Sequence, residues 1–361
     1  MNRTMHPRPL RSAPAAPPRK MAVVGAGIAG LACARTLMQA GGDVQVFERA
    51  DATGGRTRAC ETPFGTFDAG AQYFTVRDAR FSQVLATTPG LCRPWSANAV
   101  RVLDPHGRVA EAALPKPEAH WVAVPRMDAL AAQWAEPISA AARLHLNTRV
   151  ARIERDALDA SRWQLRTAGP GGEVHVASGF DAVLLALPSP LAAGLLQASG
   201  LAPGLAAQLG DVQVAPCWTL MLAFPQAAQP GLPHLGPQWN AALSTHHRIA
   251  WLARESSKPR RGTVERWTVQ ASAEWTQEHL EDDPLRVRAK LLKGFAEITG
   301  IRAEPSHAEV LRWRHARTLK PLGRSHLWDA TSGLGACGDW CLGHRVEHAF
   351  LSGLELALAL A

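Results

Sequence analysis

The chain has 361 residues, of which 47% are hydrophobic and 19% charged, so it can bury a sizeable core and is not a wholly disordered protein. Its length suggests about two domains. The net charge is +8, but five basic residues and no acidic residue lie within residues 1–20. The charge excess is therefore largely a property of the N-terminal segment. No later run of lysine and arginine with interleaved aromatic residues suggests a nucleic-acid partner.

Residues 1–20 are rich in proline, alanine and arginine and have no apolar periodicity, so we expect a disordered basic tail there. No stretch reaches the ~18 uninterrupted apolar residues of a membrane span, and no membrane partner is predicted. The six cysteines form no C-x-x-C pair and have no zinc-ligand spacing with histidines. The sequence thus predicts no metal site, and scattered free thiols favour the cytoplasm.

A glycine-rich turn follows the first apolar segment, residues 21–24, and precedes a predicted helix at 28–39. It matches G-x-G-x-x-G in the strand–turn–helix context that binds dinucleotides. The first glycine permits the turn, the second lets the backbone approach a pyrophosphate, and the third lets the helix pack on the strand. The helix N-terminus favours the phosphates. The residues predicted to bind the dinucleotide here are Gly25, Ala26, Gly27, Ile28, Ala29 and Gly30.

The second predicted strand, residues 44–48, ends in Glu48, at about the ~20-residue spacing expected for a carboxylate that binds a ribose 2′-hydroxyl. Its charge would repel a 2′-phosphate, so the motif favours an unphosphorylated ADP moiety, as in FAD or NAD. Arg49 follows directly, and we place it in the same site. Further on, Gly55 gives the chain freedom to curl, and Arg56 offers a cationic fork suited to a phosphate.

Small residues recur at 68–72, where they would let the backbone pass close to a flat group. Gln72 follows, and the aromatic pair Tyr73-Phe74 would flank that group; a surface loop or the end of a core strand accounts for these residues equally well. Downstream, residues 144–153 and 163–166 are predicted strands, the second at a sheet edge. Residues 180–187 are apolar throughout, which is typical of a buried parallel strand.

Prolines and tryptophans become frequent after residue 190. Strands are predicted at 218–224, 249–254 and 265–271, and an amphipathic helix at 285–298. The pair His246-His247 is interpreted as a solvated turn without a proton-transfer partner. Near the C-terminus, a strand at 334–337 leads to Gly338 and Asp339 and then to a helix that begins at Val346. A glycine and a carboxylate between a strand end and a helix N-terminus predict a second polyol and anion site.

These motifs resemble the FAD-binding start of the flavin amine oxidase superfamily, which carries Gly25-x-Gly27-x-x-Gly30, then Glu48, then Gly54-Gly55-Arg56. Residues 68–78 resemble the bacterial renalase-like branch of that superfamily, as do Trp251-x-x-Arg254-x-Ser256-Ser257-Lys258-Pro259 and the segment 267–275. The resemblance runs from about residue 21 to the C-terminus. It moves the interpretation of the dinucleotide from FAD or NAD to FAD.

The resemblance implies roles for further residues. It places the backbone of Val150 against the adenine, Gly338-Asp339 at the ribitol, and the helix from Val346 at the pyrimidine edge of the flavin. Residues 72–78 would lie beside the isoalloxazine ring, with Gln72 and Tyr73 as cofactor contacts. Arg77 and Arg345 are candidate contacts for a dinucleotide substrate. The complete predicted substrate site comprises Phe74, Thr75, Val76, Arg77, Asp78, Trp275, Trp313 and Arg345; no catalytic side chain is assigned, because the flavin carries the chemistry.

The predicted fold class is α/β, with a Rossmann-type FAD-binding domain split in the sequence and a second, mainly antiparallel-sheet substrate domain. We expect residues 21–75, 121–190 and 307–361 in the first domain and 76–120 and 191–306 in the second. The resemblance implies an oxidase that transfers hydride from an isomeric dihydro-NAD(P) to flavin N5 and then reduces O2, giving NAD(P)+ and H2O2. The alternatives are an amine oxidase, a desaturase and a non-catalytic flavin-binding protein. A pair of tyrosines over the flavin is impossible, because Tyr73 is the one tyrosine of the chain.

Overall fold

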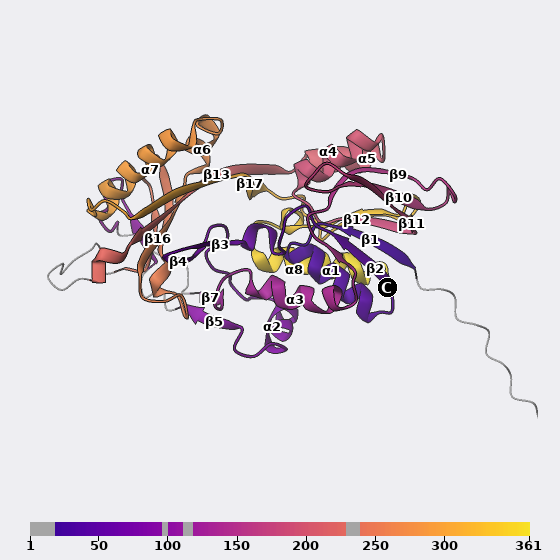
Figure 1. Ribbon diagram of the computed structural model, residues 1–361, viewed down its shortest axis with the longest axis horizontal. Coiled ribbons are helices and arrows are strands. Elements are labelled where there is room, and N and C mark those ends of the chain that lie inside the picture. The colour runs from indigo at the N-terminus through magenta and orange to yellow at the C-terminus, as the bar shows by residue number, and fades with distance from the viewer. Residues whose placement is uncertain (1–18, 96–99, 111–117, 229–238) are drawn as a thin grey trace, which may run out of the picture.

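The computed structural model describes residues 19–95, 100–110, 118–228 and 239–361. It has two lobes, a parallel-sheet lobe and an antiparallel-sheet lobe, joined by two long strands (Figure 1). The predicted tail lies outside the described residues up to position 18. Lys20, its last residue, already belongs to the first strand, β1 (Lys20–Val24), and its backbone N–H donates to Asp181 Oδ2 at 2.7 Å.

The parallel-sheet lobe is built on a six-stranded sheet with the order β18-β19-β12-β1-β2-β8. Its strands pair in parallel except at one edge, where β18 runs antiparallel to β19. The central strand β1 has apolar residues on both faces, which suits a parallel sheet covered on both sides. Besides β1, the strands are β2 (Asp43–Phe47), β8 (Leu144–His145), β12 (Ala182–Leu185), β18 (Leu327–Asp329) and β19 (Leu334–Ala336).

Helices α1 (Ile28–Gln39), α3 (Ala129–Ala140) and α8 (Val346–Leu358) share one hydrophobic cluster with Met21 and Val23 of β1. The neighbouring residues Ala22 and Val24 join a second cluster on the other face. Since successive side chains of a strand point to opposite faces, β1 lies between two helical or sheet layers. The second cluster holds α4 (Ser189–Ser199), α5 (Pro203–Gly210) and a three-stranded sheet of β9 (Arg149–Arg155), β10 (Trp163–Ala168) and β11 (Val174–Phe180).

The antiparallel-sheet lobe contains a six-stranded sheet with the order β17-β13-β16-β15-β14-β6. All neighbours are antiparallel except β14 and β6. Figure 1 shows β13 and β17 running from this lobe toward α4 and α5 of the other. The strands are β6 (Val100–Leu103), β13 (Gln213–Phe224), β14 (Ala241–Ser244), β15 (Ile249–Arg254), β16 (Glu265–Ala271) and β17 (His307–Lys320).

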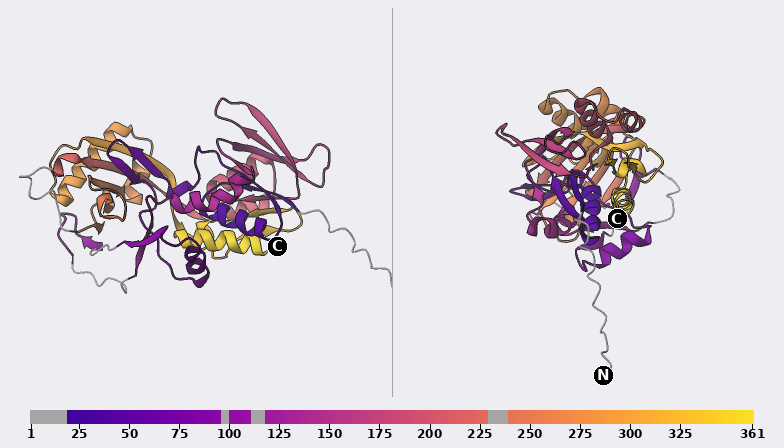
Figure 2. Two further views of the ribbon diagram at one scale, coloured as in Figure 1. Left: turned by 60° about the horizontal axis from the view of Figure 1, so that its bottom comes forward. Right: turned by 90° about the vertical axis from the view of Figure 1, so that its right-hand side faces the viewer.

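One face of this sheet is covered by α6 (Ala273–Glu278) and α7 (Pro284–Thr299), which bury Trp267 and Phe295 between them and the strands. The opposite face carries Met221 and packs against Phe67 of the hairpin β3 (Ala59–Thr62) and β4 (Gly65–Asp68). The view from a second direction keeps the two lobes apart with the strands between them (Figure 2). This hairpin face is the one turned toward the parallel-sheet lobe.

Two remaining elements stand at the junction. Helix α2 (Ala79–Ala86) packs on α8, with the rings of Phe81 and Phe350 5.2 Å apart. Strand β5 (Cys92–Trp95) pairs with β7 (His120–Ala123). Both lie close to the segment that the sequence placed beside the flavin.

The structure corrects several sequence-based expectations. The single strand expected at 144–153 is two strands in different sheets, because Asn147 adopts a left-handed conformation (φ 52°) between them. The expected edge strand β10 lies in the centre of its sheet. Strand β17 belongs to the antiparallel sheet, although residues 307 onward were expected in the FAD-binding domain. Helices α2, α4 and α5 pack on the parallel-sheet lobe, although their residues were expected mainly in the substrate domain. Their apolar faces complete the cores of that lobe.

Candidate functional site

The three motif glycines have different roles in the fold. Gly25 has φ +107°, and a Cβ there would lie 2.5 Å from the Ala186 carbonyl oxygen. A Cβ at Gly30 would lie 2.0 Å from the Gly25 carbonyl oxygen. Gly27 differs, because its φ is −77° and an added Cβ would meet nothing within 4 Å. Packing therefore explains two of the glycines, whereas the space beside Gly27 is the space a pyrophosphate needs.

Helix α1 begins directly after this turn, and no side chain caps it. Its first-turn N–H groups are thus left for a ligand or solvent. Ile28 and Ala29 begin the helix and are buried, and Ala26 is buried beside them. The Ala26 N–H donates to Glu48 Oε2 at 2.8 Å. The glycine turn and the carboxylate at the end of β2 are therefore in direct contact.

Glu48 is held at its position by backbone groups. Its second oxygen, Oε1, accepts the Ala50 N–H at 2.9 Å, and its carbonyl accepts the Thr148 N–H at 2.7 Å. The latter bond brings the chain leading to Val150 alongside. Arg49 is exposed at the same edge. This is the carboxyl end of a parallel strand, where nucleotide-binding sheets present their ligand contacts.

The loop after β2 joins the same cradle. Gly54 donates its N–H to the Ala26 carbonyl at 2.9 Å, and a short 3₁₀ turn, Gly55–Thr57, follows. Arg56 within that turn forms a two-point ion pair with Asp339, with Nη2 to Oδ1 at 2.5 Å and Nη1 to Oδ2 at 3.2 Å. Asp339 also accepts the hydroxyl of Thr318 on β17 at 3.2 Å. An N-terminal segment, a C-terminal segment and a strand of the antiparallel-sheet lobe thus meet at the carboxylate of Asp339.

Gly338 lies at the end of β19. A Cβ there would be 2.2 Å from the Trp340 indole nitrogen, and its N–H donates to the Ser352 hydroxyl at 2.9 Å. Helix α8 starts at Val346 without a side-chain cap, so its first turn is open in the same way as that of α1. The structure therefore gives both predicted helix N-termini free N–H groups on one side of the sheet.

The segments 72–78 and 339–347 meet through Glu347, which is buried in the first turn of α8. Its Oε1 accepts the backbone N–H groups of Arg77 and Asp78, both at 2.7 Å. Arg345 Nη1 lies 3.5 Å from the Thr75 hydroxyl. Phe74 and Val76 pack into the neighbouring core. The site proposed from the sequence is thus assembled from these two segments.

Arg77 and Arg345 share one carboxylate. Both Nε and Nη2 of Arg77 bond to Glu118, the latter at 2.7 Å, and this hydrogen bonding raises the pKa of Arg77. Arg345 Nη1 lies 3.9 Å from Glu118. Arg77 is 57% exposed. Both arginines therefore lie at the partly exposed edge of the candidate site, which we call the rim. The carboxylate of Glu118 lies between them, and the sequence did not identify it.

Tyr73 stands next to this group. Its ring lies 4.2 Å from that of His120 and 5.5 Å from that of Trp251, measured between centroids. Burial raises the pKa of the Tyr73 hydroxyl, while the positive charges of Arg345 and Arg317 act to lower it. Arg317, on β17, was not identified from the sequence. An arginine in a strand gives no local signal of what lies opposite it.

A buried ion cluster lies under the 68–73 segment, and the sequence analysis assigned it no role. Lys258 Nζ contacts Asp68 Oδ2 at 3.0 Å, Glu255 Oε1 at 2.8 Å and the Gln72 side-chain carbonyl at 3.2 Å. Arg261 Nη2 contacts the same Asp68 oxygen at 2.8 Å. The four charged side chains are completely buried. They connect the turn beside the predicted flavin to the antiparallel-sheet lobe.

The two carboxyl groups of the cluster differ. Burial opposes ionisation of Asp68, but the charges of Lys258 and Arg261 outweigh it and lower the pKa of that carboxyl. At Glu255 burial prevails and raises the pKa, with Lys258 offsetting only part of the effect. Glu255 Oε2 has no hydrogen-bond partner among the described residues. Asp68 is therefore the anionic centre that both cations share.

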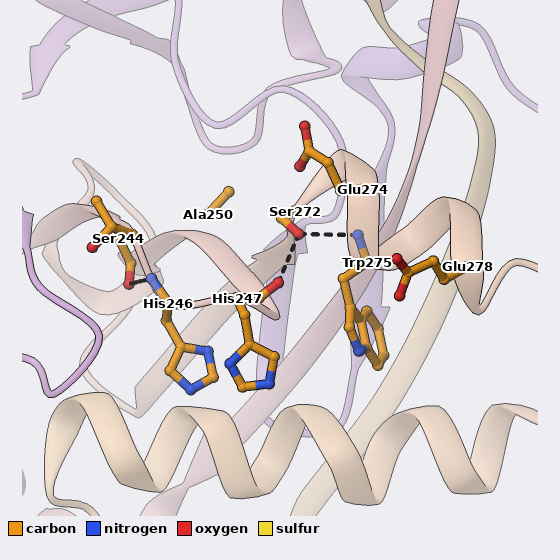
Figure 3. A pocket seen from close by; sticks show the side chains of 9 residues that line it. Ser244, His246, His247, Ala250, Ser272, Glu274, Trp275 and Glu278 are labelled. Atoms are coloured by element: carbon orange, nitrogen blue, oxygen red, sulfur yellow. Dashed lines mark hydrogen bonds between the residues drawn. The ribbon is translucent and has the colours of Figure 1, made fainter.

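The two candidate tryptophans lie on opposite faces of the antiparallel sheet. Trp313 donates its indole N–H to the Ala69 carbonyl at 3.0 Å and so touches the junction. Trp275 packs in the cluster under α7 and stacks on His279 at 4.3 Å. It borders an open concavity of about 520 Å³ on the outer face, which Figure 3 shows with Ser272 and Glu274. The structure does not bring Trp275 to the other site residues.

The histidine pair borders the same concavity (Figure 3). His246 is buried, and its Nε2 lies 3.1 Å from Glu297 Oε2 on α7, while His247 is exposed and stacked on it. The interpretation as a solvated turn without a partner is therefore wrong for His246, whose partner comes from a helix 51 residues away. Sequence distance concealed that contact.

Within the described ranges, no three side chains of the metal-ligating types come together. In the same part of the chain, no helix combines the length and the apolar character needed to cross a bilayer.

Residues 23–87 match the NAD(P)-binding Rossmann-like domain, and residues 120–360 match the flavin containing amine oxidoreductase family. A putative protoporphyrinogen oxidase from Exiguobacterium sp. 255-15 has a similar structure, with a TM-score of 0.72 and 14% identity over 95% of this chain and 98% of the other.

Two amine oxidases have similar structures as well. Cyclohexylamine oxidase from Brevibacterium oxydans IH-35A gives a TM-score of 0.68 at 15% identity, covering 95% of this chain and 99% of the other. A redesigned putrescine oxidase gives 0.68 at 12% identity, covering 95% and 98%. These likenesses establish the fold, and the family match spans about two thirds of the chain. The chain belongs to the flavin containing amine oxidoreductase family, and its cofactor is FAD.

Proposed function

We propose that this protein is an oxidase of isomeric dihydronicotinamide dinucleotides, which it returns to NAD(P)+ while O2 is reduced to H2O2. In each turnover the substrate loses a hydride, and O2 takes up that hydride together with one proton. FAD, when bound, supplies the redox chemistry by accepting the hydride at N5. The chain supplies binding and orientation, and hydride transfer at close range requires no strong general base.

The residues of the cradle fit the cofactor. The open space at Gly27 suits the pyrophosphate, and the carboxylate of Glu48 beside it suits a ribose. Asp339 and the uncapped start of α8 would take the ribitol and the flavin end. Arg56 would act mainly by holding Asp339, because its guanidinium is committed to that carboxylate.

One observation carries the choice of substrate, namely the cationic side chains at this junction. Arg345 lies 3.5 Å from the hydroxyl of Thr75, two residues after Tyr73, and the positive charges of Arg345 and Arg317 act on the Tyr73 hydroxyl against the negative charge of Glu118. A protonated amine would be repelled by these charges, whereas a substrate that carries phosphates would be attracted. Burial lowers the pKa of His344 and His348 nearby, so these rings add no full positive charge at neutral pH. The arginines thus favour an anionic substrate.

An amine substrate is the second candidate, and a specific contact favours it. Tyr73 and Trp251 stand 5.5 Å apart with their rings inclined by 39°, which provides two aromatic surfaces in one place. Two of the structurally similar proteins are named as oxidases of putrescine and cyclohexylamine. Aromatic surfaces bind cationic amines by cation–π attraction, worth about 0.5–2 kcal/mol. The nearby arginines oppose that attraction.

The test begins with the purified holoenzyme and its flavin absorption spectrum. Anaerobic mixing with borohydride-reduced NAD, which contains the isomeric dihydro forms, should bleach the flavin rapidly. Ordinary NADH and benzylamine should not. After oxygen is admitted, H2O2 should form in equal amount to the NAD+ produced.

The opposite results have distinct meanings. Bleaching by amines alone would refute the proposed substrate and establish the second candidate. Bleaching by none of these compounds would indicate a flavin-binding protein without this activity.

A further inference from the structure

The two arginines at the rim that the sequence identified are already engaged. Arg77 places two guanidinium nitrogens on Glu118, and Arg345 lies 3.9 Å from the same carboxylate and 3.5 Å from the Thr75 hydroxyl. A substrate phosphate would have to compete with Glu118 for either of them. The cation that a phosphate meets without such competition must therefore be a different one.

Arg317 meets this requirement. It is exposed on β17, opposite Ala215 of β13, and it makes no ion pair or side-chain hydrogen bond with any residue in the described ranges. Its charge acts on the Tyr73 hydroxyl and, more strongly than any other charge, on the ring of His344. Its neighbour Thr318 contacts Asp339, so Arg317 lies on β17 beside the first residue of the 339–347 segment.

The backbone around Arg317 is held on both sides. The carbonyl of Ala316 accepts Arg56 Nη1 at 3.5 Å, and the hydroxyl of Thr318 donates to Asp339 at 3.2 Å. These contacts fix the backbone from which Arg317 extends. Its planar guanidinium can form two parallel hydrogen bonds with a phosphate.

Resting on the proposed function, we infer that Arg317 binds a phosphate of the dinucleotide substrate and thereby determines specificity for a phosphorylated substrate. It contributes to binding and leaves the hydride transfer itself unchanged. Arg345 and Arg77 hold the rim through Glu118, whereas Arg317 supplies a cation that has no ion-pair partner in the part of the chain that the structure describes. The substrate class assigned to the site is therefore a dihydronicotinamide that carries phosphate.

The experiment compares holoenzymes of the wild type, R317Q and R314Q. Arg314 is a matched control, because it lies on the same strand and loses the same charge but pairs with Glu281 on the outer side. Each enzyme is titrated with ADP-ribose while the flavin absorbance is followed. Each is also reduced anaerobically by the dihydro isomers of NAD and of the phosphate-free nicotinamide riboside.

For R317Q we expect the Kd of ADP-ribose and the KM of the dinucleotide to rise at least ~10-fold, as for loss of a charge-assisted two-point contact. The limiting rate of flavin reduction should stay within about twofold. Reduction by the phosphate-free riboside should be equal in all three enzymes, and R314Q should match the wild type. R317K, which keeps the charge without the fork, should lie between.

Other outcomes overturn the inference. An unchanged Kd and KM in R317Q would show that Arg317 binds no phosphate, even if the wild type oxidises the dinucleotide. An equal loss with the riboside would show that Arg317 acts on the ring end. If the wild type is reduced by benzylamine and by no dihydronicotinamide, the proposed function fails, and the assignment of Arg317 to a substrate phosphate fails with it.

Discussion

The core of the parallel-sheet lobe and its junction with the antiparallel-sheet lobe are held together by different physical means. In the core, backbone approaches backbone: a Cβ at Gly30 would lie 2.0 Å from one carbonyl oxygen, and a Cβ at Gly353 of α8 would lie 2.1 Å from that of Ala29 on α1. At the junction, buried charges do the corresponding work, with Asp68 bound by Lys258 and Arg261. The glycine contacts are disrupted by an added Cβ, whereas the ion cluster is disrupted by the loss of a charged side chain.

This difference explains why the sequence predicts the glycine contacts of the parallel-sheet lobe but not the ion cluster at the junction. A glycine contact within a strand–turn–helix unit is local, so the spacing of the glycines reveals it. The ion cluster joins Asp68 to residues almost 200 positions later, the sequence separation to Arg261 being 193. No local pattern marks such a set of residues.

The largest expected effect tests the junction. K258M leaves Asp68 with one cation and Glu255 with none, and it should lower the free energy of unfolding by about 3–5 kcal/mol, the usual cost of breaking a buried ion pair. Urea titration of the holoenzyme measures this. K293M is the control, since Lys293 is 69% exposed and its loss should cost no more than about 0.5 kcal/mol.

Where K258M fails to fold, the double variant K258M/E255Q keeps the prediction testable. Removing the second unpaired charge should recover part of the loss. A loss below about 1 kcal/mol in K258M would mean that the cluster does not hold the lobes together.

A pair of glycine variants tests the core and separates packing from ligand space. G30A forces a Cβ against the Gly25 carbonyl and should cost about 1–3 kcal/mol in stability. G27A has room for its Cβ and should change the stability of the FAD-free protein by less than about 0.5 kcal/mol. Its FAD content after dialysis should nevertheless fall sharply, because the methyl occupies the space of the pyrophosphate.

Thermal unfolding for stability and absorbance for FAD content measure both variants. If G27A retained FAD as well as the wild type does, the open space at Gly27 would not be the cofactor site.

Measuring the thermal stability of the protein over a range of pH tests partly buried histidines in both lobes. Burial lowers the pKa of rings such as His145 and His315 below the ordinary value of 6.5. Between the folded and unfolded pKa values the unfolded chain binds more protons, so stability rises with pH there. The Tm should therefore fall as pH is lowered from about 7.5 to 5.5. Glu255 acts in the opposite direction, because burial raises its pKa and its contribution to stability grows as the pH falls.

The variant H145F keeps the stacking on Phe47 but removes one titrating ring, so its Tm should fall less over the same range. A Tm that rises as the pH is lowered would contradict the assignment of these rings as neutral.

The smallest effect distinguishes the two faces of the antiparallel sheet. W313F removes the hydrogen bond to the Ala69 carbonyl, should cost about 0.5–1.5 kcal/mol, and should shift the flavin absorption spectrum. W275F lies on the outer face and should leave that spectrum and the KM unchanged. A spectral change in W275F but not in W313F would contradict this assignment, because it would place the flavin at the outer face of the antiparallel sheet.

Much of the fold could be predicted, because the strongest signals are periodic and local. Helix α1 and the strands β15 and β16 have the bounds that the pattern gave, and the fold class is confirmed. The lobe boundaries could not be predicted, because α4 and β17 are ordinary apolar or alternating segments whose pattern fits either lobe. Which core they complete depends on the shape of the surface they cover.

The sequence by itself determined the parts of the proposed cofactor cradle: glycine spacing, a carboxylate after β2 and a Gly-Asp before the last helix each act within a few residues. The tertiary structure alone decided the charges around the proposed substrate site. It paired Arg77 with Glu118 and committed Arg56 to Asp339, and it gave Arg317 no ion pair within the described ranges. Local backbone geometry is encoded by neighbouring residues, whereas the pairing of charges depends on which distant strands and helices come within a few ångströms.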